Sequence, residues 1–164
     1  MKTLFLLRHA KSSWNNARLT DFERPLNERG RQAATLIGNF MRQQQLIPQL
    51  IVCSPAERAR ETIELVREAA ALTAELRFDE RIYEASLQTL NAIVSRLDES
   101  ANAALLVGHN PGFEELLAAL TGADERMPTA ALAHITLNIE RWTEARQRSG
   151  ELVRLAKPKE IANG

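Results

Sequence analysis

The chain has 164 residues, a length typical of one domain, and we expect residues 1–164 to fold as a single unit. Its 21 lysines and arginines balance 21 aspartates and glutamates, so the formal net charge is +0, and no basic block is present that would follow a nucleic-acid backbone. A single cysteine, Cys53, excludes an internal disulfide and a cysteine-rich zinc site and favours a reducing compartment, the cytoplasm.

Apolar runs alternate with helical patterns along the chain, which predicts an α/β domain of three layers, a mostly parallel central sheet with helices on both faces. The first run, over 3–7, is too short for a secretory signal core and ends at Arg8, so we interpret it as a strand. No run reaches the roughly 20 apolar residues of a membrane span, so we expect a soluble protein. The expected strands cover 3–7, 50–53, 76–78, 103–107, 131–137 and 152–155, and helical spacing of apolar residues predicts helices around 33–41, 87–97 and 113–120.

Two of the three histidines directly follow expected strands. His9 comes after the first strand with Arg8 beside it, and His109 comes after the strand over 103–107. Because the carboxyl ends of parallel strands meet at one edge of a sheet, we expect the two imidazoles to lie close together. His134 lies inside an alternating strand pattern instead, and we interpret it as a structural residue.

Helix starts follow two of these strands. Ser54-Pro55-Ala56-Glu57 predicts a capping box, with Ser54 as the N-cap and Glu57 three residues later. Asn110-Pro111 repeats the combination of a capping residue and proline after His109. Since exposed N–H groups and the helix dipole favour anions, the pattern predicts a phosphate-sized site at this edge of the sheet.

Arg58 falls in the first turn of the helix that follows Ser54, from where its guanidinium can reach back over the sheet edge. Glu61 and Thr62 lie one turn further on and are candidates to hold its orientation. Arg58 and Arg8 together supply two planar guanidinium groups, which are suited to bind phosphoryl oxygens. The alternative is that Arg58 belongs to a solvated helix face with ordinary ion pairs.

These residue types favour phosphoryl transfer through histidine. A neutral His9 imidazole can attack phosphorus and then pass the phosphoryl group to water, and neighbouring Arg8 and Arg58 disfavour its protonation. Two-step transfer removes the need for a metal, and we expect no cofactor. His109 would donate to a phosphoryl oxygen as negative charge builds.

At these residues the chain resembles the histidine phosphatase superfamily, which includes phosphoglycerate mutases, and within it the small SixA-type phosphohistidine phosphatases. The matching segments span nearly the whole chain: Arg8-His9-Ala10-Lys11-Ser12-Ser13-Trp14-Asn15, Asp21, Arg24-Pro25-Leu26-Asn27-Glu28-Arg29-Gly30, Ser54-Pro55, Arg58-Ala59, Glu61-Thr62, Val107-Gly108-His109-Asn110-Pro111-Gly112 and Lys157-Pro158-Lys159. Ala10 stands where the family motif has glycine. The resemblance implies a phosphoglycerate mutase-like fold and a transient phosphohistidine on His9, in a phosphate pocket with Arg8, Arg58 and His109.

Two further site residues come from the same resemblance. Asn15 matches the family's asparagine after the tryptophan and would add a hydrogen bond to the phosphoryl group. Glu84 resembles in position the acid that protonates the departing oxygen in family phosphoesterases. The alternative for Glu84 is an ordinary carboxylate near a helix start, favourable to the dipole.

We expect the substrate to be phosphohistidine on a protein, because so short a chain leaves few residues for a lid over a small substrate. The alternatives are a phosphatase for small phosphoesters and a non-catalytic regulator that binds phosphohistidine. Mutase activity would also need basic residues that bind the carboxylate of a phosphoglycerate. Lys11 and Arg24 are the candidates for this task, and we interpret both as surface or loop residues.

Other site types do not fit the spacing. Cysteine phosphatases need five residues between nucleophile and arginine, whereas four separate Cys53 from Arg58, so we interpret Cys53 as a core thiol. No nucleotide-binding glycine loop, His-Glu-x-x-His pair or calcium loop is present. Trp142 is expected in the core, and Trp14 is either a pocket wall or a packed aromatic residue.

Overall fold

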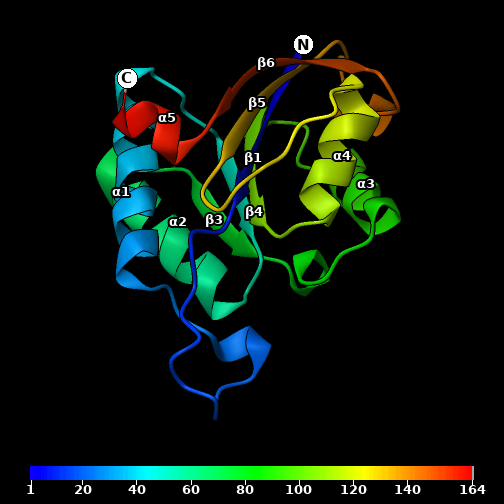
Figure 1. Cartoon of the computed structure of the whole chain (residues 1–164). Coiled ribbons are helices and arrows are strands. Elements are labelled where there is room, and N and C mark those ends of the chain that lie inside the picture. The colour runs from blue at the N-terminus through cyan, green and yellow to red at the C-terminus, as the bar shows by residue number, and fades with distance from the viewer. Residues whose placement is uncertain (164) are drawn as a thin grey trace.

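The fold of residues 1–163 is described by a computed structural model whose centre is one six-stranded sheet, in the order β3-β2-β4-β1-β5-β6 (Figure 1). The strands are β1 (Lys2–Arg8), β2 (Leu50–Cys53), β3 (Glu75–Phe78), β4 (Ala103–Gly108), β5 (Leu132–Leu137) and β6 (Gly150–Ala156). The helices are α1 (Glu28–Gln43), α2 (Glu57–Ala70), α3 (Leu87–Ser95), α4 (Gly112–Thr121) and the short α5 (Pro158–Ala162), with 3-10 turns at Asp21–Glu23, Glu80–Ile82 and Trp142–Glu144.

The sheet is mostly parallel, as predicted. β1 pairs in parallel with β4, and β2 pairs in parallel with both β3 and β4. β5 is antiparallel to β1, and β6 is antiparallel to β5, so these two strands extend one side of the parallel unit. Each predicted strand is present. Four of them are longer than predicted by one to three residues, β2 has the predicted bounds, and β5 begins one residue later.

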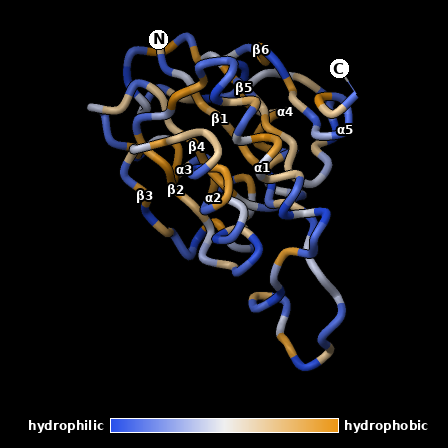
Figure 2. Tube along the Cα trace, turned by 90° about the vertical axis from the view of Figure 1, so that its left-hand side faces the viewer, coloured by the Kyte–Doolittle hydropathy of each residue, from blue (hydrophilic) through white to orange (hydrophobic). Residues whose placement is uncertain are grey.

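The helices cover both faces of the sheet, which confirms the three-layer α/β architecture (Figures 1 and 2). Side chains of β1 alternate between the two faces: Leu4 and Leu6 pack with α3 and α4, whereas Phe5 and Leu7 pack with α1 and α2. Trp142 is fully buried in the first of these cores, as expected. Within residues 1–163, no helix combines the length and the apolar character needed to cross a membrane.

The register of the parallel strands brings three strand ends together. Arg8 at the end of β1 lies opposite Gly108 at the end of β4, and Cys53 at the end of β2 lies opposite Val107. The residues that follow these strands therefore meet at one edge of the sheet. In Figure 1 this is the lower edge, below which the loop between β1 and α1 projects.

The predicted capping box at Ser54 is wrong. Helix α2 begins at Glu57, and its N-cap, Ala56, has no side chain able to cap it. The Ser54 hydroxyl accepts a hydrogen bond from the Ala56 N–H at 3.3 Å and also bonds the imidazole of His109. The Ser54 hydroxyl therefore forms hydrogen bonds at the sheet edge and does not cap the first turn of α2.

The predicted cap at Asn110 is also wrong. Helix α4 begins at Gly112 with Pro111 as its N-cap, and no side chain caps it. The Asn110 amide instead donates to Glu114 and to the carbonyl of Met127. It therefore ties the start of α4 to the segment that leads into β5.

Candidate active site

Two histidines and one arginine meet at the carboxyl edge of the sheet. The rings of His9 and His109 lie 5.1 Å apart, and each side chain is only 8% exposed. Arg58, in the first turn of α2, donates from Nε to Nε2 of His9 at 3.4 Å. The structure thus brings together these three predicted residues, which directly follow β1 and β4 or belong to α2.

Hydrogen bonding fixes which nitrogen of His9 carries the proton. Nδ1 lies 2.7 Å from the carbonyl of Ala10, which can only accept, so Nδ1 donates and Nε2 keeps its lone pair. Burial, and then the charges of Arg58 and Arg8, lower the pKa of His9 to about 4 despite the bond to Ala10. His9 is therefore neutral near pH 7, and its unprotonated Nε2 faces Arg58.

Ala10 fills the glycine position of the family motif without backbone strain, because it is not among the residues with positive φ. It is fully buried, and its N–H donates to the hydroxyl of Thr62 at 2.9 Å. That hydroxyl in turn donates to the carbonyl of Arg58. Thr62 therefore links the backbone that follows β1 to the first turn of α2.

His109 is held by Ser54. Its Nε2 lies 2.7 Å from the Ser54 hydroxyl, which accepts from Ala56. Within residues 1–163 the hydroxyl has no other acceptor for its own proton, so we assign it as the donor to Nε2. With Nε2 as acceptor, Nδ1 carries the ring proton, and this buried Nδ1 bonds to no other residue of the described chain. Burial, followed by the neighbouring His9 and Arg58, lowers the pKa of His109 to about 3.

Arg8 reaches the same edge from the last position of β1. One of its terminal nitrogens donates to the carbonyl of Met127 at 3.0 Å, and its buried Nε bonds to no residue in the range 1–163. Burial lowers the pKa of Arg8, which stays protonated at neutral pH. Arg8 is thus partly tethered and keeps a free donor.

Asp21 holds the guanidinium of Arg58, a contact that sequence reasoning missed. Its carboxylate accepts from Arg58 at 3.0 Å and from Tyr83 at 2.6 Å, and its carbonyl accepts from Arg58 at 2.7 Å. The suggestion that Glu61 and Thr62 orient this guanidinium is wrong, because Glu61 bonds the N–H of Leu26 instead. Asp21 matches the family pattern in the sequence, but this match did not indicate Arg58 as its partner.

Tyr83 completes a wall of the site, and no pattern in the sequence pointed to it. Its ring stands edge-on to His109 with centroids 5.4 Å apart. Burial and the hydrogen bond to Asp21 raise the pKa of Tyr83 to about 12, so its hydroxyl remains a donor. Its neighbour Glu84 is exposed and has a positive φ of 54°.

Glu84 lines the same cavity as Arg58 and His109. This cavity, of about 460 Å³, is lined by Arg58, His109, Asp21, Glu84 and Glu115 among others, and we call it the acidic groove. Its three carboxylates stand on separate elements around the entrance. The structure therefore places Glu84 beside the site, as the resemblance implied.

Asn15 does not join the cluster. It is exposed in the projecting loop, where its N–H donates to the hydroxyl of Ser13. Trp14 beside it is 77% exposed and packs against the guanidinium of Arg24. Arg24 is a loop residue, as one of the two predictions had it, but it is buried and bonds Asp21, which anchors the loop to the site.

The fold and the site together define an α/β protein with a histidine–arginine pocket able to bind a tetrahedral anion. Arg8 and His109 each keep a buried nitrogen without a partner in residues 1–163, at the edge where the unprotonated Nε2 of His9 lies. Guanidinium groups grip phosphoryl oxygens, and an unprotonated imidazole nitrogen can attack phosphorus. Within residues 1–163, no group of three or more His, Cys, Asp or Glu side chains is arranged to hold a metal ion.

Comparison with known proteins identifies the family of the chain. Residues 4–103 match the model of the histidine phosphatase superfamily (branch 1), and the chain belongs to this family. An uncharacterized protein of Mycobacterium leprae is 30% identical over 93% of this chain and 100% of its own length. A candidate phosphohistidine phosphatase, SixA, from Agrobacterium tumefaciens is 28% identical and superposes with a TM-score of 0.83 over 96% of this chain and 98% of its own. The corresponding protein of Nakamurella multipartitia is 27% identical, with a TM-score of 0.83 over 96% of each chain.

Proposed function

We propose that this chain is a phosphatase that hydrolyses phosphohistidine carried on a protein, without a metal, through a transient phosphohistidine at His9. The observation that carries the proposal is the neutral His9, whose Nδ1 is held by the Ala10 carbonyl and whose unprotonated Nε2 accepts a long hydrogen bond from Arg58. The likeness to two candidate phosphohistidine phosphatases at 28% and 27% identity supports the substrate class.

The first step is attack of the His9 Nε2 lone pair on phosphorus. A bond forms between Nε2 and phosphorus, while the bond from phosphorus to the substrate imidazole breaks. Its electron pair leaves with that imidazole, which departs neutral because a proton on its other ring nitrogen leaves with it. Arg8, Arg58 and the Nδ1–H of His109 would donate to the phosphoryl oxygens as charge builds on them. The carbonyl of Ala10 stabilises the positive charge that the His9 ring acquires.

The second step is attack of water on the phosphorylated His9. The bond between Nε2 and phosphorus breaks, its electron pair returns to Nε2, and inorganic phosphate departs with the oxygen of the water molecule. His9 is then neutral again, in agreement with its pKa of about 4. Both steps use groups already in place at the sheet edge.

The test is hydrolysis of an aryl phosphate and of free phosphohistidine in excess chelator, with wild type beside His9→Ala. We expect turnover that survives chelation, is lost by a factor of at least about 10³ in the variant, and leaves an acid-labile phosphate on His9 in rapid-quench mass analysis. Folding of the variant is checked by circular dichroism. Absence of turnover and of the adduct in a folded wild-type protein would contradict the proposal and favour a binding regulator.

A second candidate function, hydrolysis of small phosphoesters, is favoured by the position of Glu84 in the acidic groove with His109. An alkoxide is a poorer leaving group than an imidazole and needs an acid more. We therefore expect Glu84→Gln to lose about 10²-fold in kcat on alkyl phosphates and little on phosphohistidine. Equal losses on the two substrates would contradict this role, and Glu115→Gln is the matched control in the same groove.

A further inference from the structure

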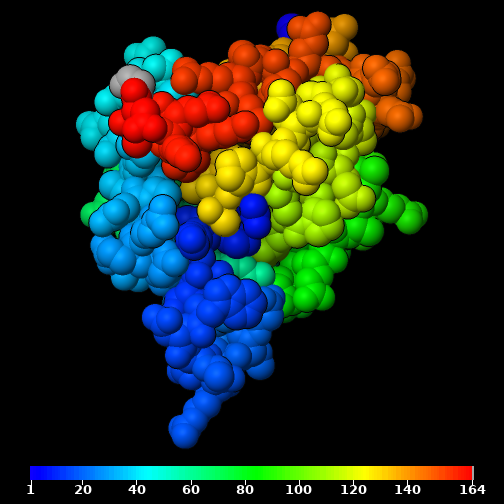
Figure 3. Space-filling model, in the orientation of Figure 1, coloured from blue at the N-terminus to red at the C-terminus, as the bar shows by residue number. Residues whose placement is uncertain are grey.

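A second groove adjoins the site on the side of α1 and α5. It has a volume of about 800 Å³, and its walls come from α1, from the segment before β5 and from the C-terminal helix. Figure 3 shows these three parts, blue, amber and red, meeting on one face with the dark blue residues that follow β1 between them. We call it the basic groove.

The chain connects the basic groove directly to His9. Lys11, in its wall, lies two residues beyond His9. Thr129, in the opposite wall, precedes Ala130, whose N–H donates to the carbonyls of both Arg8 and His9. A molecule bound in the groove would therefore reach the residues that flank the nucleophile.

The lining combines cations with an apolar floor. Side chains such as Leu36 and Pro128 contribute apolar surface, and a single carboxylate, Glu160, stands against four cations. The four are Lys11, Arg29, Lys157 and Lys159. Within residues 1–163 none of the four forms an ion pair or a side-chain hydrogen bond, and all eight ion pairs involve other residues. The groove therefore keeps a net positive charge.

We propose that the basic groove docks an acidic, amphipathic segment of the phosphorylated protein, next to the phosphohistidine that enters the site. The inference rests on the proposed function and adds a partner of stated chemistry. Carboxylates of the segment would pair with the four cations, and its apolar side chains would cover the floor. A free phosphate ion would use the charge but not the apolar surface.

The acidic groove on the other side of the site would favour one orientation of the docked protein. Asp21 in that groove is paired with Arg58 and Arg24, but Glu84 and Glu115 form no ion pair within residues 1–163. These two carboxylates give this side a negative charge, opposite to that of the basic groove. A partner with its acidic flank toward α1 and α5 is attracted, and the reverse orientation brings like charges together. Opposite charges on the two sides therefore select one orientation.

The test compares two peptides of equal length, each with one histidine phosphorylated by phosphoramidate. One flank carries glutamates and leucines, and in the other peptide lysines replace the glutamates. We expect wild type to hydrolyse the acidic peptide with a kcat/KM about tenfold higher, a preference that shrinks at high salt. The variant Arg29→Glu/Lys157→Glu/Lys159→Glu should lose the preference while its hydrolysis of aryl phosphate stays unchanged.

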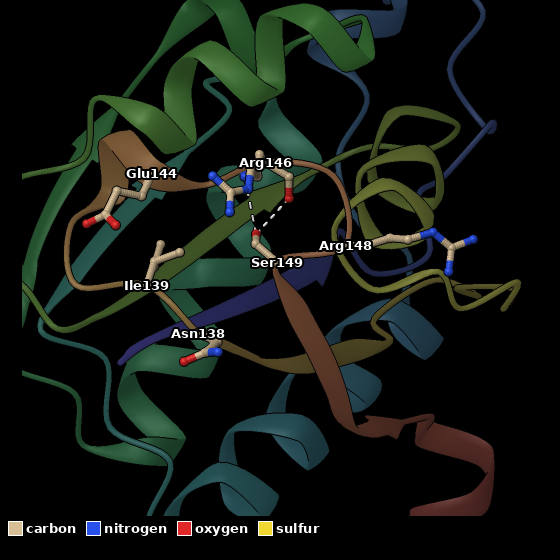
Figure 4. A pocket seen from close by; sticks show the side chains of 6 residues that line it. All are labelled: Asn138, Ile139, Glu144, Arg146, Arg148 and Ser149. Atoms are coloured by element: carbon tan, nitrogen blue, oxygen red, sulfur yellow. Dashed lines mark hydrogen bonds between the residues drawn. The ribbon is translucent and has the colours of Figure 1, made fainter.

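A matched control reverses three exposed cations outside the groove, as Arg42→Glu/Arg96→Glu/Arg146→Glu. Arg146 lines a cavity of about 190 Å³ between β5 and β6, at the opposite end of the sheet. Figure 4 shows the guanidinium groups of Arg146 and Arg148 pointing apart, so this cavity does not gather charge as the basic groove does. The control changes net charge equally and should keep the preference.

The outcomes separate the two proposals. Equal kcat/KM for both peptides with intact hydrolysis of aryl phosphate would overturn the docking proposal and leave the proposed function standing. If no substrate is turned over, binding of the unphosphorylated, fluorescent acidic peptide is measured by anisotropy: binding that the groove variant loses supports docking although the proposed function fails. Equally tight binding of a single-stranded RNA of the same charge would overturn the assignment to an acidic protein segment.

Discussion

Asp21 binds three groups of the candidate site at once. Its carboxylate accepts from Tyr83, Arg58 and Arg24, at distances between 2.6 and 3.0 Å. The hydrogen bond from Tyr83, and then the bonds from the arginines, lower the pKa of Asp21 to about 2 against the effect of burial. The carboxylate is therefore charged at neutral pH and fixes the Arg58 fork while Nε of Arg58 faces His9.

Replacement of this carboxylate tests whether it positions Arg58. We expect Asp21→Asn to lower kcat/KM for aryl phosphate by about tenfold, mostly through KM, because Arg58 loses a charged partner while its bond to the Asp21 carbonyl persists. Tyr83→Phe removes only the hydroxyl and should have a smaller effect. An increase in kcat/KM for Asp21→Asn would show that the carboxylate competes with the phosphoryl group instead.

The residues that meet at the sheet edge differ in how well the sequence predicts them. His9 and His109 could be predicted because each directly follows an apolar strand, and parallel strands end at the same edge. The contacts of Asp21 could not, because 37 residues separate it from Arg58 and 62 from Tyr83, and it comes from a loop without periodicity. Where a loop folds back depends on side-chain packing that no local pattern encodes.

At the scale of elements, the start of α1 lies against the backbone that follows β1. Asn27 caps this helix by accepting from the N–H of Gly30 at 2.8 Å, and its own N–H donates to the carbonyl of Lys11. A Cβ on Gly30 would collide with that same carbonyl. The helix therefore needs glycine here, because backbone meets backbone beside the nucleophile.

This contact predicts the effect of adding one methyl group. We expect Gly30→Ala to lower the free energy of unfolding by about 2 kcal/mol, because the gain in helix propensity is outweighed by the displaced backbone. Chemical denaturation measures the change. Thr35→Ala, at an exposed position of the same helix, is the control and should change stability by less than about 0.5 kcal/mol. An unchanged midpoint for Gly30→Ala would mean that α1 shifts freely.

The two wrong helix caps show where reasoning about elements reaches its limit. Ser54-Pro55 has the composition of a helix start, but Pro55 and Ala56 still lie outside the helix, and α2 begins at Glu57. The hydroxyl of Ser54 then bonds His109, which comes from a strand 55 residues later. A tertiary hydrogen bond thus replaces the local one that the pattern predicts.

At the scale of the whole molecule, folding buries two histidines in their neutral form. The pKa of His9 falls to about 4 and that of His109 to about 3, whereas an unfolded chain has histidines near 6.5. As the pH falls, the unfolded chain therefore binds protons before the folded one does. The stability that these residues contribute is fully present above about pH 6.5 and is lost as the pH falls toward the folded values.

This difference in pKa predicts that the free energy of unfolding falls as the pH falls. It also predicts that a single substitution makes this fall smaller. Between about pH 7 and about pH 5, protonation of His9 in the unfolded chain should cost the wild type about 2 kcal/mol of unfolding free energy, and His9→Gln should lose correspondingly less over the same interval. Urea denaturation at both pH values measures the difference. Burial also lowers the pKa of His134, but this side chain is only half-buried, so His134→Gln should recover a smaller part. An identical pH dependence in wild type and His9→Gln would show that His9 titrates alike in both states, and the neutral nucleophile would lose its physical basis.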